Sequence, residues 1–138
     1  MLYGEYEHNL DEKGRVTVPS SFREALGTVF VTRGPEGCLL VFELDTWLDL
    51  SRKLKKKSIS QHVARVLFSG TQAQPDGHGR ILIPSGLRTY AGLVPGQPVV
   101  VLGVGDRLEI WNRERWLDLN GSLLESGELA AGLSELEL

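Results

Sequence analysis

The chain has 138 residues, a formal net charge of −3, 41% hydrophobic residues and 24% charged residues, as expected for a globular protein of one or two small domains. No apolar run reaches the roughly 20 residues that a membrane-spanning helix needs, and we expect no secretory signal in the polar, acidic N-terminal segment. The single cysteine, Cys38, excludes an internal disulfide and lies in an apolar run, so we expect it to be buried rather than reactive. These features indicate a cytoplasmic protein.

Charge is distributed unevenly along the chain. Residues 1–70 contain ten Lys or Arg and nine Asp or Glu, whereas residues 71–138 contain five and nine. The last segment, 121–138, has four Glu and no Lys or Arg. The net charge therefore neither supports nor excludes a nucleic-acid partner, and local patches must decide.

An internal repeat is the most informative feature of the sequence. Residues 11–27 and 76–92 share Asp, Gly, Arg, Pro, Ser, Arg and Gly in the same order at a constant offset of 65. After a four-residue insertion the offset becomes 69, where Trp47–Leu50 and Trp116–Leu119 both read W-L-D-L. So many matches with one gap indicate that one supersecondary unit occurs twice.

Each unit is predicted to begin with a strand and a short helix. In the first unit, apolar and polar residues alternate over Val16–Val18 as in a half-buried strand. Pro19 ends this strand because proline has no backbone N–H to donate to a sheet. Ser21 and Glu24 fit a capping box for the helix, and Gly27 suits its C-terminus. The second unit repeats this pattern between residues 81 and 92.

Two further strands follow the short helix in each unit. We expect them near Val29–Arg33 and Leu39–Glu43 in the first unit, joined by a Gly-Pro-Glu-Gly turn. Their counterparts are expected near Val99–Leu102 and Arg107–Trp111. Together these elements predict a small fold with mostly antiparallel strands.

A helix is expected to close each unit, with Asp45 as the cap of the first and Asn112 as the cap of the second. The apolar spacing within 59–67 predicts one more helix between the units, and such a stripe more often packs in a core than binds a cofactor. We expect residues 123–138 to be frayed, or helical only against a partner.

Both units open with an acidic residue, a glycine three positions later, and then arginine. The residues are Asp11, Gly14, Arg15 and Asp76, Gly79, Arg80. The glycine permits a tight turn with positive φ, which would hold the carboxylate near the guanidinium. A single loop of this kind is more simply explained as a turn with a weak surface salt bridge. Its duplication favours a shared function, although duplication alone shows architecture.

Two blocks resemble the MraZ family: M-L-Y-G-E-Y-E-H-N-L-D-E-K-G-R-V-T-V-P-S-S-F-R-E and F-S-G-T-Q-A-Q-P-D-G-H-G-R-I-L-I-P-S-G-L-R-T-Y-A-G. This resemblance covers the chain to about Trp116. It implies the AbrB/SpoVT superfamily fold, which is mostly β with short helices (α+β). In that fold two pseudo-symmetric modules form a tandem swapped-hairpin β-barrel. It also implies a ring-shaped homo-oligomer, nucleoid association, and a regulator, usually a repressor, of its own division and cell-wall gene cluster.

On this basis we divide the chain into a first module (5–57), a connecting helix and linker (58–72), a second module (73–119) and an acidic tail (120–138). The resemblance implies double-stranded DNA, in the form of short promoter repeats, as the partner. It implies no cofactor, no metal and no small-molecule substrate.

Carried over residue by residue, the family signature implies four DNA-binding side chains: Arg15, Lys13, Arg80 and His78. It implies four loop-positioning residues: Asp11, Gly14, Asp76 and Gly79. The second loop departs from the first, because His78 stands where the first has Lys13 and Pro75 stands where an apolar strand residue is expected. A histidine with a pKa near 6.5 is mostly uncharged at neutral pH, so we expect the second loop to contribute less to DNA binding.

Residues 52–57 form a basic cluster with three open interpretations. The cations can be solvated at a helix C-terminus, where they are favourable to the helix dipole. They can also form a second DNA contact or part of a subunit interface.

Catalysis is the less favoured class of function. His8, His62 and His78 are scattered, and the sequence has neither H-E-x-x-H nor C-x-x-C. Residues 77–80 could cradle a phosphate, but the full P-loop pattern is missing. A protein-interaction scaffold or antitoxin-type partner remains the alternative to a DNA-binding regulator, because apolar tail residues such as Leu133 and Leu136 could dock another protein.

Overall fold

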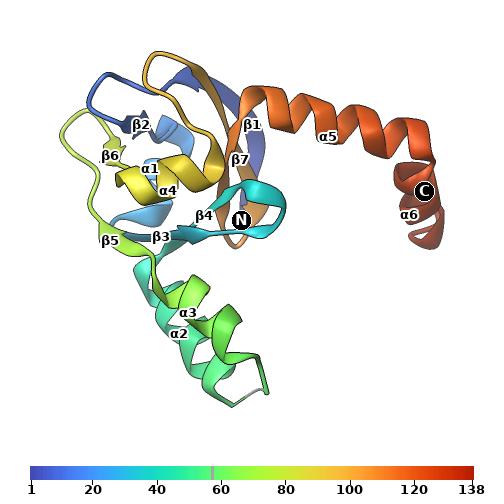
Figure 1. Ribbon diagram of the computed structural model, residues 1–138, viewed down its shortest axis with the longest axis horizontal. Coiled ribbons are helices and arrows are strands. Elements are labelled where there is room, and N and C mark those ends of the chain that lie inside the picture. Colours follow the sequence, from blue (N-terminus) through green and yellow to red (C-terminus); the bar gives the residue numbers. More distant parts are fainter. Residues whose placement is uncertain (57) are drawn as a thin grey trace.

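Eight antiparallel strands, six α-helices and one 3-10 helix (Pro35–Gly37) make up the described residues, 1–56 and 58–138, of the computed structural model (Figure 1). The strands are β1 (Leu2–Asn9), β2 (Arg15–Thr17), β3 (Val29–Arg33), β4 (Leu39–Glu43), β5 (Thr71–Ala73), β6 (Arg80–Leu82), β7 (Pro98–Gly105) and β8 (Leu108–Asn112). The helices are α1 (Ser20–Leu26), α2 (Leu44–Lys55), α3 (Gln61–Phe68), α4 (Ser85–Ala91), α5 (Arg113–Ser126) and α6 (Glu128–Glu135). Lys57, the last residue of the predicted basic cluster, lies outside the described residues.

Six strands form one antiparallel sheet in the order β1-β7-β8-β4-β3-β5, while β2 and β6 pair in a separate ribbon. The order is symmetric when each strand of one unit is exchanged for its counterpart in the other. Strands of the two units pair at β1–β7, β4–β8 and β3–β5, so the units interlock. Hydrogen bonds between the described residues leave this sheet open, with β1 and β5 at its edges. The predicted α+β fold with two tandem modules is confirmed.

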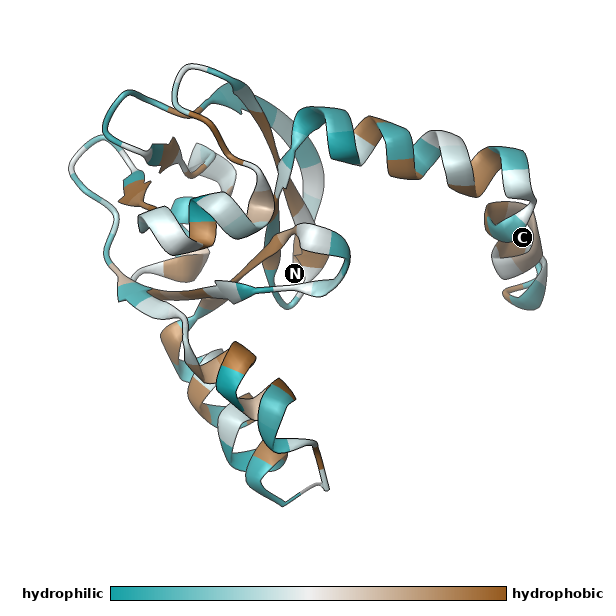
Figure 2. Ribbon diagram, viewed as in Figure 1, coloured by the Kyte–Doolittle hydropathy of each residue, from teal (hydrophilic) through white to brown (hydrophobic). Residues whose placement is uncertain are grey.

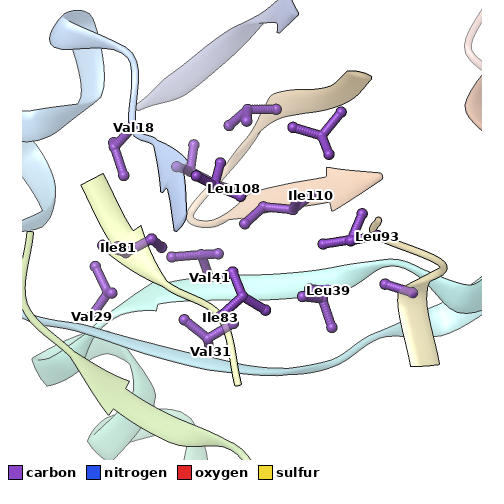
Figure 3. Close-up of a cluster of buried hydrophobic side chains, with 14 of the residues drawn as sticks. Val18, Val29, Val31, Leu39, Val41, Ile81, Ile83, Leu93, Leu108 and Ile110 are labelled. Carbon is purple, nitrogen blue, oxygen red and sulfur yellow. The ribbon is translucent and has the colours of Figure 1, made fainter. Parts of the chain in front are cut away.

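The larger of two buried hydrophobic clusters is built from both units. Val16 and Ile81 face each other in the β2–β6 ribbon and are 1% and 0% exposed. They belong to the same buried cluster as side chains from β3, β4, β7 and β8, among them Val29, Val41 and Ile110 (Figure 3). Burying one such aliphatic side chain contributes roughly 1.5–3 kcal/mol. Because each unit supplies one strand of the ribbon, neither unit can complete this core by itself.

Three helix starts were predicted, and one is confirmed. The Asn112 side chain accepts a hydrogen bond of 3.0 Å from the backbone N–H of Arg115, as a cap should. The other two predictions were wrong, because Pro19 and Glu43 occupy the N-cap positions of α1 and α2. The predicted caps therefore lie inside the first turn of each helix, and neither helix has a side-chain cap.

The strands β3 and β4 occupy the predicted residues, whereas β1 was not predicted. Its side chains are mostly exposed, so it lacks the apolar alternation that identifies a half-buried strand. Its counterpart β5 has three residues instead of eight. Leu10 donates its N–H to the carbonyl of Gln97 at 3.0 Å, whereas Pro75 at the equivalent position has no N–H to donate. Proline accounts only for the end of β5 one residue earlier than that of β1, whereas its late start at Thr71 follows from α3, which runs to Phe68.

The C-terminal tail is helical, and the expectation that it would be frayed in a single chain was wrong. Helix α5 runs from the end of β8 to Ser126, and Gly127 turns the chain into α6 with a φ of 81°. Figure 1 shows the two helices projecting from one end of the molecule as an arm. None of the helices in the described part of the chain is long and apolar enough to cross a bilayer.

Candidate functional site

The two repeated loops lie beside each other because β2 and β6 pair directly after them. In the ribbon, Arg15 lies opposite Leu82 and Thr17 lies opposite Arg80. The Nη1 atom of Arg15 is 3.9 Å from Oδ2 of Asp76, so an acidic residue of one loop reaches the arginine of the other. The loops lie at the end of the molecule opposite the arm (Figure 1).

Each loop is a tight turn organised by its aspartate. In the first, the Asp11 carboxylate accepts backbone N–H bonds from Lys13 (3.0 Å) and Arg15 (2.8 Å). In the second, Asp76 accepts the equivalent bonds from His78 (2.9 Å) and Arg80 (3.0 Å). Gly14 and Gly79 have φ values of 81° and 75°, which a residue with a Cβ adopts only at a cost. The predicted turn geometry is thus present in both loops.

The same carboxylates hold the arginine side chains. Oδ2 of Asp11 accepts a bond of 2.6 Å from Nε of Arg15, and Oδ2 of Asp76 accepts one of 2.8 Å from Nε of Arg80. The guanidinium groups are contacted through Nε, and these two side chains are 26% and 31% exposed. No hydrogen bond between described residues uses an Nη atom of either arginine, although Nη1 of Arg15 lies 3.9 Å from the Asp76 carboxylate. One rotamer of each side chain is held through Nε, which reduces the entropy lost on binding an external acceptor.

The turn geometry lowers the pKa of both carboxyl groups. For Asp76 the backbone N–H of Arg80 is the largest cause, followed among the lowering contacts by the N–H of His78 and the Arg80 side chain, and the pKa falls to about 2. The pKa of Asp11 is lowered mainly by the backbone N–H of Arg15. Both aspartates are therefore charged at neutral pH and act as fixed acceptors for the loop.

We expect the Asp76 carboxyl to titrate near pH 2 in a carboxyl-carbon NMR experiment. Because the pKa in the folded chain is lowered from 3.8, the stabilising contribution of this carboxylate is present above that value and is lost as the pH falls toward 2. Arg80→Gln should raise the pKa only in part, since the backbone donors remain. A wild-type pKa near 3.8, or a complete return to 3.8 in Arg80→Gln, would contradict this explanation.

Two arginines outside the loops were not predicted as site residues. Nε of Arg23 in α1 donates to the Val18 carbonyl at 2.8 Å, and Nη1 of Arg88 in α4 donates to the Ile83 carbonyl at 2.6 Å. The Arg23 side chain lies against Gly79 of the second loop, while Arg88 lies against Gly14 of the first. Each loop is therefore braced by an arginine of the other unit. Their recurrence at the offset of 65 was the signal that could have identified them.

Gly79→Ala should destabilise the fold much more than Gly77→Ala. A Cβ on Gly79 would lie 2.0 Å from Nε of Arg23, whereas a Cβ on Gly77 would meet no atom within 4 Å. We expect Gly79→Ala to lower the free energy of unfolding by about 1–2 kcal/mol for the left-handed backbone and by roughly 1 kcal/mol more for the displaced Arg23 hydrogen bond. Urea denaturation measures the difference. Equal losses in the two variants would contradict both the cost of the left-handed backbone at Gly79 and the displacement of Arg23.

The remaining predicted contact residues, Lys13 and His78, occupy equivalent exposed positions at the tips of the loops. The basic cluster lies elsewhere, because its described residues are at the end of α2, and the α2–α3 hairpin projects away from the loops (Figure 1). Cys38 is fully buried, as expected, and burial raises the pKa of its thiol to about 12.

Comparisons with known proteins agree with the repeat and with the loops. The family model for the MraZ protein, which is described as antitoxin-like, matches the chain twice, over residues 1–69 and 66–128. The chain is 41% identical to a protein of Clostridium acetobutylicum across 99% of both chains. It is 41% identical to one of Finegoldia magna across the whole of both chains, and 43% identical to one of Alkaliphilus metalliredigens across 99% of both. Each of these three proteins bears the name transcriptional regulator MraZ.

Proposed function

Because this chain belongs to the MraZ family, we propose that it is a DNA-binding transcriptional regulator whose paired loops carry the DNA contact. The observation that supports this proposal most directly is the duplicated geometry of Asp11 with Arg15 and of Asp76 with Arg80. Two guanidinium groups, each held through Nε by its own carboxylate, are presented from one two-stranded ribbon. A β-ribbon fits the major groove of DNA.

Arginine suits this task for chemical reasons. Its planar fork can donate two hydrogen bonds to O6 and N7 of a guanine, or to a phosphate. Lys13 adds a positive charge toward the backbone of the duplex, where cation contacts release counterions and make binding salt-dependent. The acidic tail lies at the end of the molecule opposite the loops (Figure 1), so its negative charge would be kept away from a duplex bound at the loops.

We further propose that a ring of chains binds tandem short repeats in the promoter of its own division and cell-wall gene cluster, and represses it. One pair of loops is a small footprint. Several subunits that engage successive repeats on one duplex would raise the overall affinity through effective concentration, without new contacts. Two observations on the genome test this part of the proposal: whether the neighbouring genes serve division and cell-wall synthesis, and whether short tandem repeats lie upstream of the gene.

The test is binding of the full chain to the DNA just upstream of its gene, against a shuffled duplex of equal length and composition. We expect preference for the upstream duplex and an affinity that falls steeply between about 50 and 200 mM salt. Equal affinity for both duplexes, or binding to neither, would instead favour a protein-interaction scaffold, the alternative class for this chain.

A further inference from the structure

Apolar side chains are exposed along the projecting arm, which we define as residues 117–138. Leu129, Leu133 and Leu136 follow at helical spacing and are 45%, 39% and 69% exposed, and Leu124 of α5 is 71% exposed. Figure 2 shows these apolar stretches on helices that lie well outside the main core. A stripe of this kind on a projecting element marks an interaction surface.

A groove of about 220 Å³ lies between α3 and the turn that joins β3 to β4. Its lining includes Pro35, Leu40, Val63, Val66 and Leu67. Val63 is 46% exposed in the single chain, so the groove offers apolar surface that nothing in the described chain covers fully. One wall of this groove is α3 of the α2–α3 hairpin (residues 44–68), and the hairpin projects from a different side of the molecule than the arm (Figure 2).

The groove is preformed rather than loosely packed. Thr32 Oγ1 donates to the carbonyl of Leu67 at 2.7 Å, which fixes the end of α3 on β3. Arg33 Nη1 donates to Ser69 Oγ at 2.7 Å, and its guanidinium lies 5.6 Å from the centre of the Tyr90 ring. A partner that fills the groove therefore pays little ordering entropy at this surface.

The two surfaces have opposite charge. The arm carries five Asp or Glu and no Lys or Arg, a balance of −5. The α2–α3 hairpin carries six Lys or Arg and two Asp, a balance of +4. Its described cations Lys53, Lys55, Lys56 and Arg65 are exposed and make no ion pair with another described residue. The groove itself is lined by Arg33, and the exposed lysines lie on the same hairpin, at the end of α2. Opposite charge on the arm and on the side of the molecule that holds the groove favours their association and guides their encounter.

We propose that the arm of one copy of this chain docks in the α3 groove of the next copy. Within one chain the arm and the α2–α3 hairpin project in different directions (Figure 1). A contact between two different surfaces is heterologous, so repetition closes a ring or extends a filament. The contact deepens the proposed function by naming the surfaces on which the ring rests. The basic cluster then serves the subunit interface rather than the DNA.

Complementary charge reversal tests the contact in the full-length chain. One variant carries Lys53→Glu, Lys55→Glu and Lys56→Glu, and the other carries Glu125→Lys, Glu128→Lys and Glu135→Lys. In a solution of either variant alone, the arm and the hairpin carry charge of the same sign and repel each other. Light scattering should then give the mass of one chain, 15.2 kDa. In an equimolar mixture every arm meets an opposite charge, and the mass of the wild-type assembly should return.

Apolar contact is tested by Val63→Glu in the groove and Leu133→Glu in the arm, with Val104→Glu as the control. Val104 is 38% exposed in β7, outside both surfaces, so its variant should keep the wild-type mass. A wild-type chain that is monomeric, reversal variants that keep the assembly, or a mixture that stays monomeric would each overturn the contact. Circular dichroism of every variant verifies that the fold is intact.

Binding to a duplex with a single repeat separates this contact from the proposed function. We expect both reversal variants to bind that duplex with affinity within about threefold of wild type. Lost binding in the lysine variant with an intact assembly would assign the basic cluster to DNA and overturn the docking. A wild-type assembly that dissociates on charge reversal but never binds DNA selectively would support the docking and refute the regulator.

Discussion

Replacing Arg15 with alanine is expected to abolish sequence-selective DNA binding while leaving the mass of the assembly unchanged. Paired hydrogen bonds between arginine and guanine contribute about 1–3 kcal/mol of discrimination, or roughly 5- to 150-fold for each loop. Several subunits on one duplex multiply this loss. Competition between the upstream duplex and a shuffled duplex measures it, with light scattering on the same samples.

Two matched variants separate the roles of charge and geometry. Arg15→Lys keeps the charge but loses the planar fork, so it should retain salt-dependent binding to any duplex and lose selectivity. Arg80→Ala should weaken binding less than Arg15→Ala, because the second loop carries His78 where the first carries Lys13. Equal effects would show that the nearly identical geometry of the loops outweighs that exchange. Loss of the assembly in Arg15→Ala would assign Arg15 a structural role instead.

Ile81→Ala is expected to destabilise the entire chain and not only the second unit. The Ile81 side chain is fully buried in a core built from both units, opposite Val16 of the first. Truncation of a buried isoleucine costs about 2–5 kcal/mol through lost transfer free energy and the cavity left behind. Urea unfolding should shift to lower concentration as one transition, whether followed by tryptophan fluorescence or by circular dichroism.

The adjacent residue provides the control for this prediction. Leu82 lies on the same strand but is 55% exposed, so Leu82→Ala should lower the free energy of unfolding by less than about 1 kcal/mol. Two separated transitions in the Ile81 variant would show that the units fold independently. Similar losses for the two alanine variants would contradict the interlocked core.

Much of the secondary structure was predictable because it depends on local sequence. The strands β3 and β4 have apolar, β-rich runs bounded by turn residues, and the structure places them at the predicted residues. The caps at Asp45 and Ser21 were predicted wrongly because capping depends on where the helix starts. In both helices the N-cap lies two residues earlier than predicted, at Glu43 and Pro19.

In the candidate site, too, the contacts within a short segment were predictable and the contacts between distant segments were not. Each Asp-x-x-x-Arg turn closes through hydrogen bonds within five residues, so residue type and spacing were sufficient to predict the contact of Asp11 with Arg15. The bracing of Gly79 by Arg23 and of Gly14 by Arg88 was not predictable in this way, because it joins segments more than fifty residues apart.

By itself, the sequence determined the repeat, the turns and the residues that carry charge at their tips, since all of these follow from short-range spacing. Only the tertiary structure decided which strands of the two units pair, and it showed that the acidic arm and the basic hairpin project in different directions. The physical reason is that burial of apolar side chains selects the pairing of strands across the entire chain. Local hydrogen bonds are satisfied equally well by several alternatives.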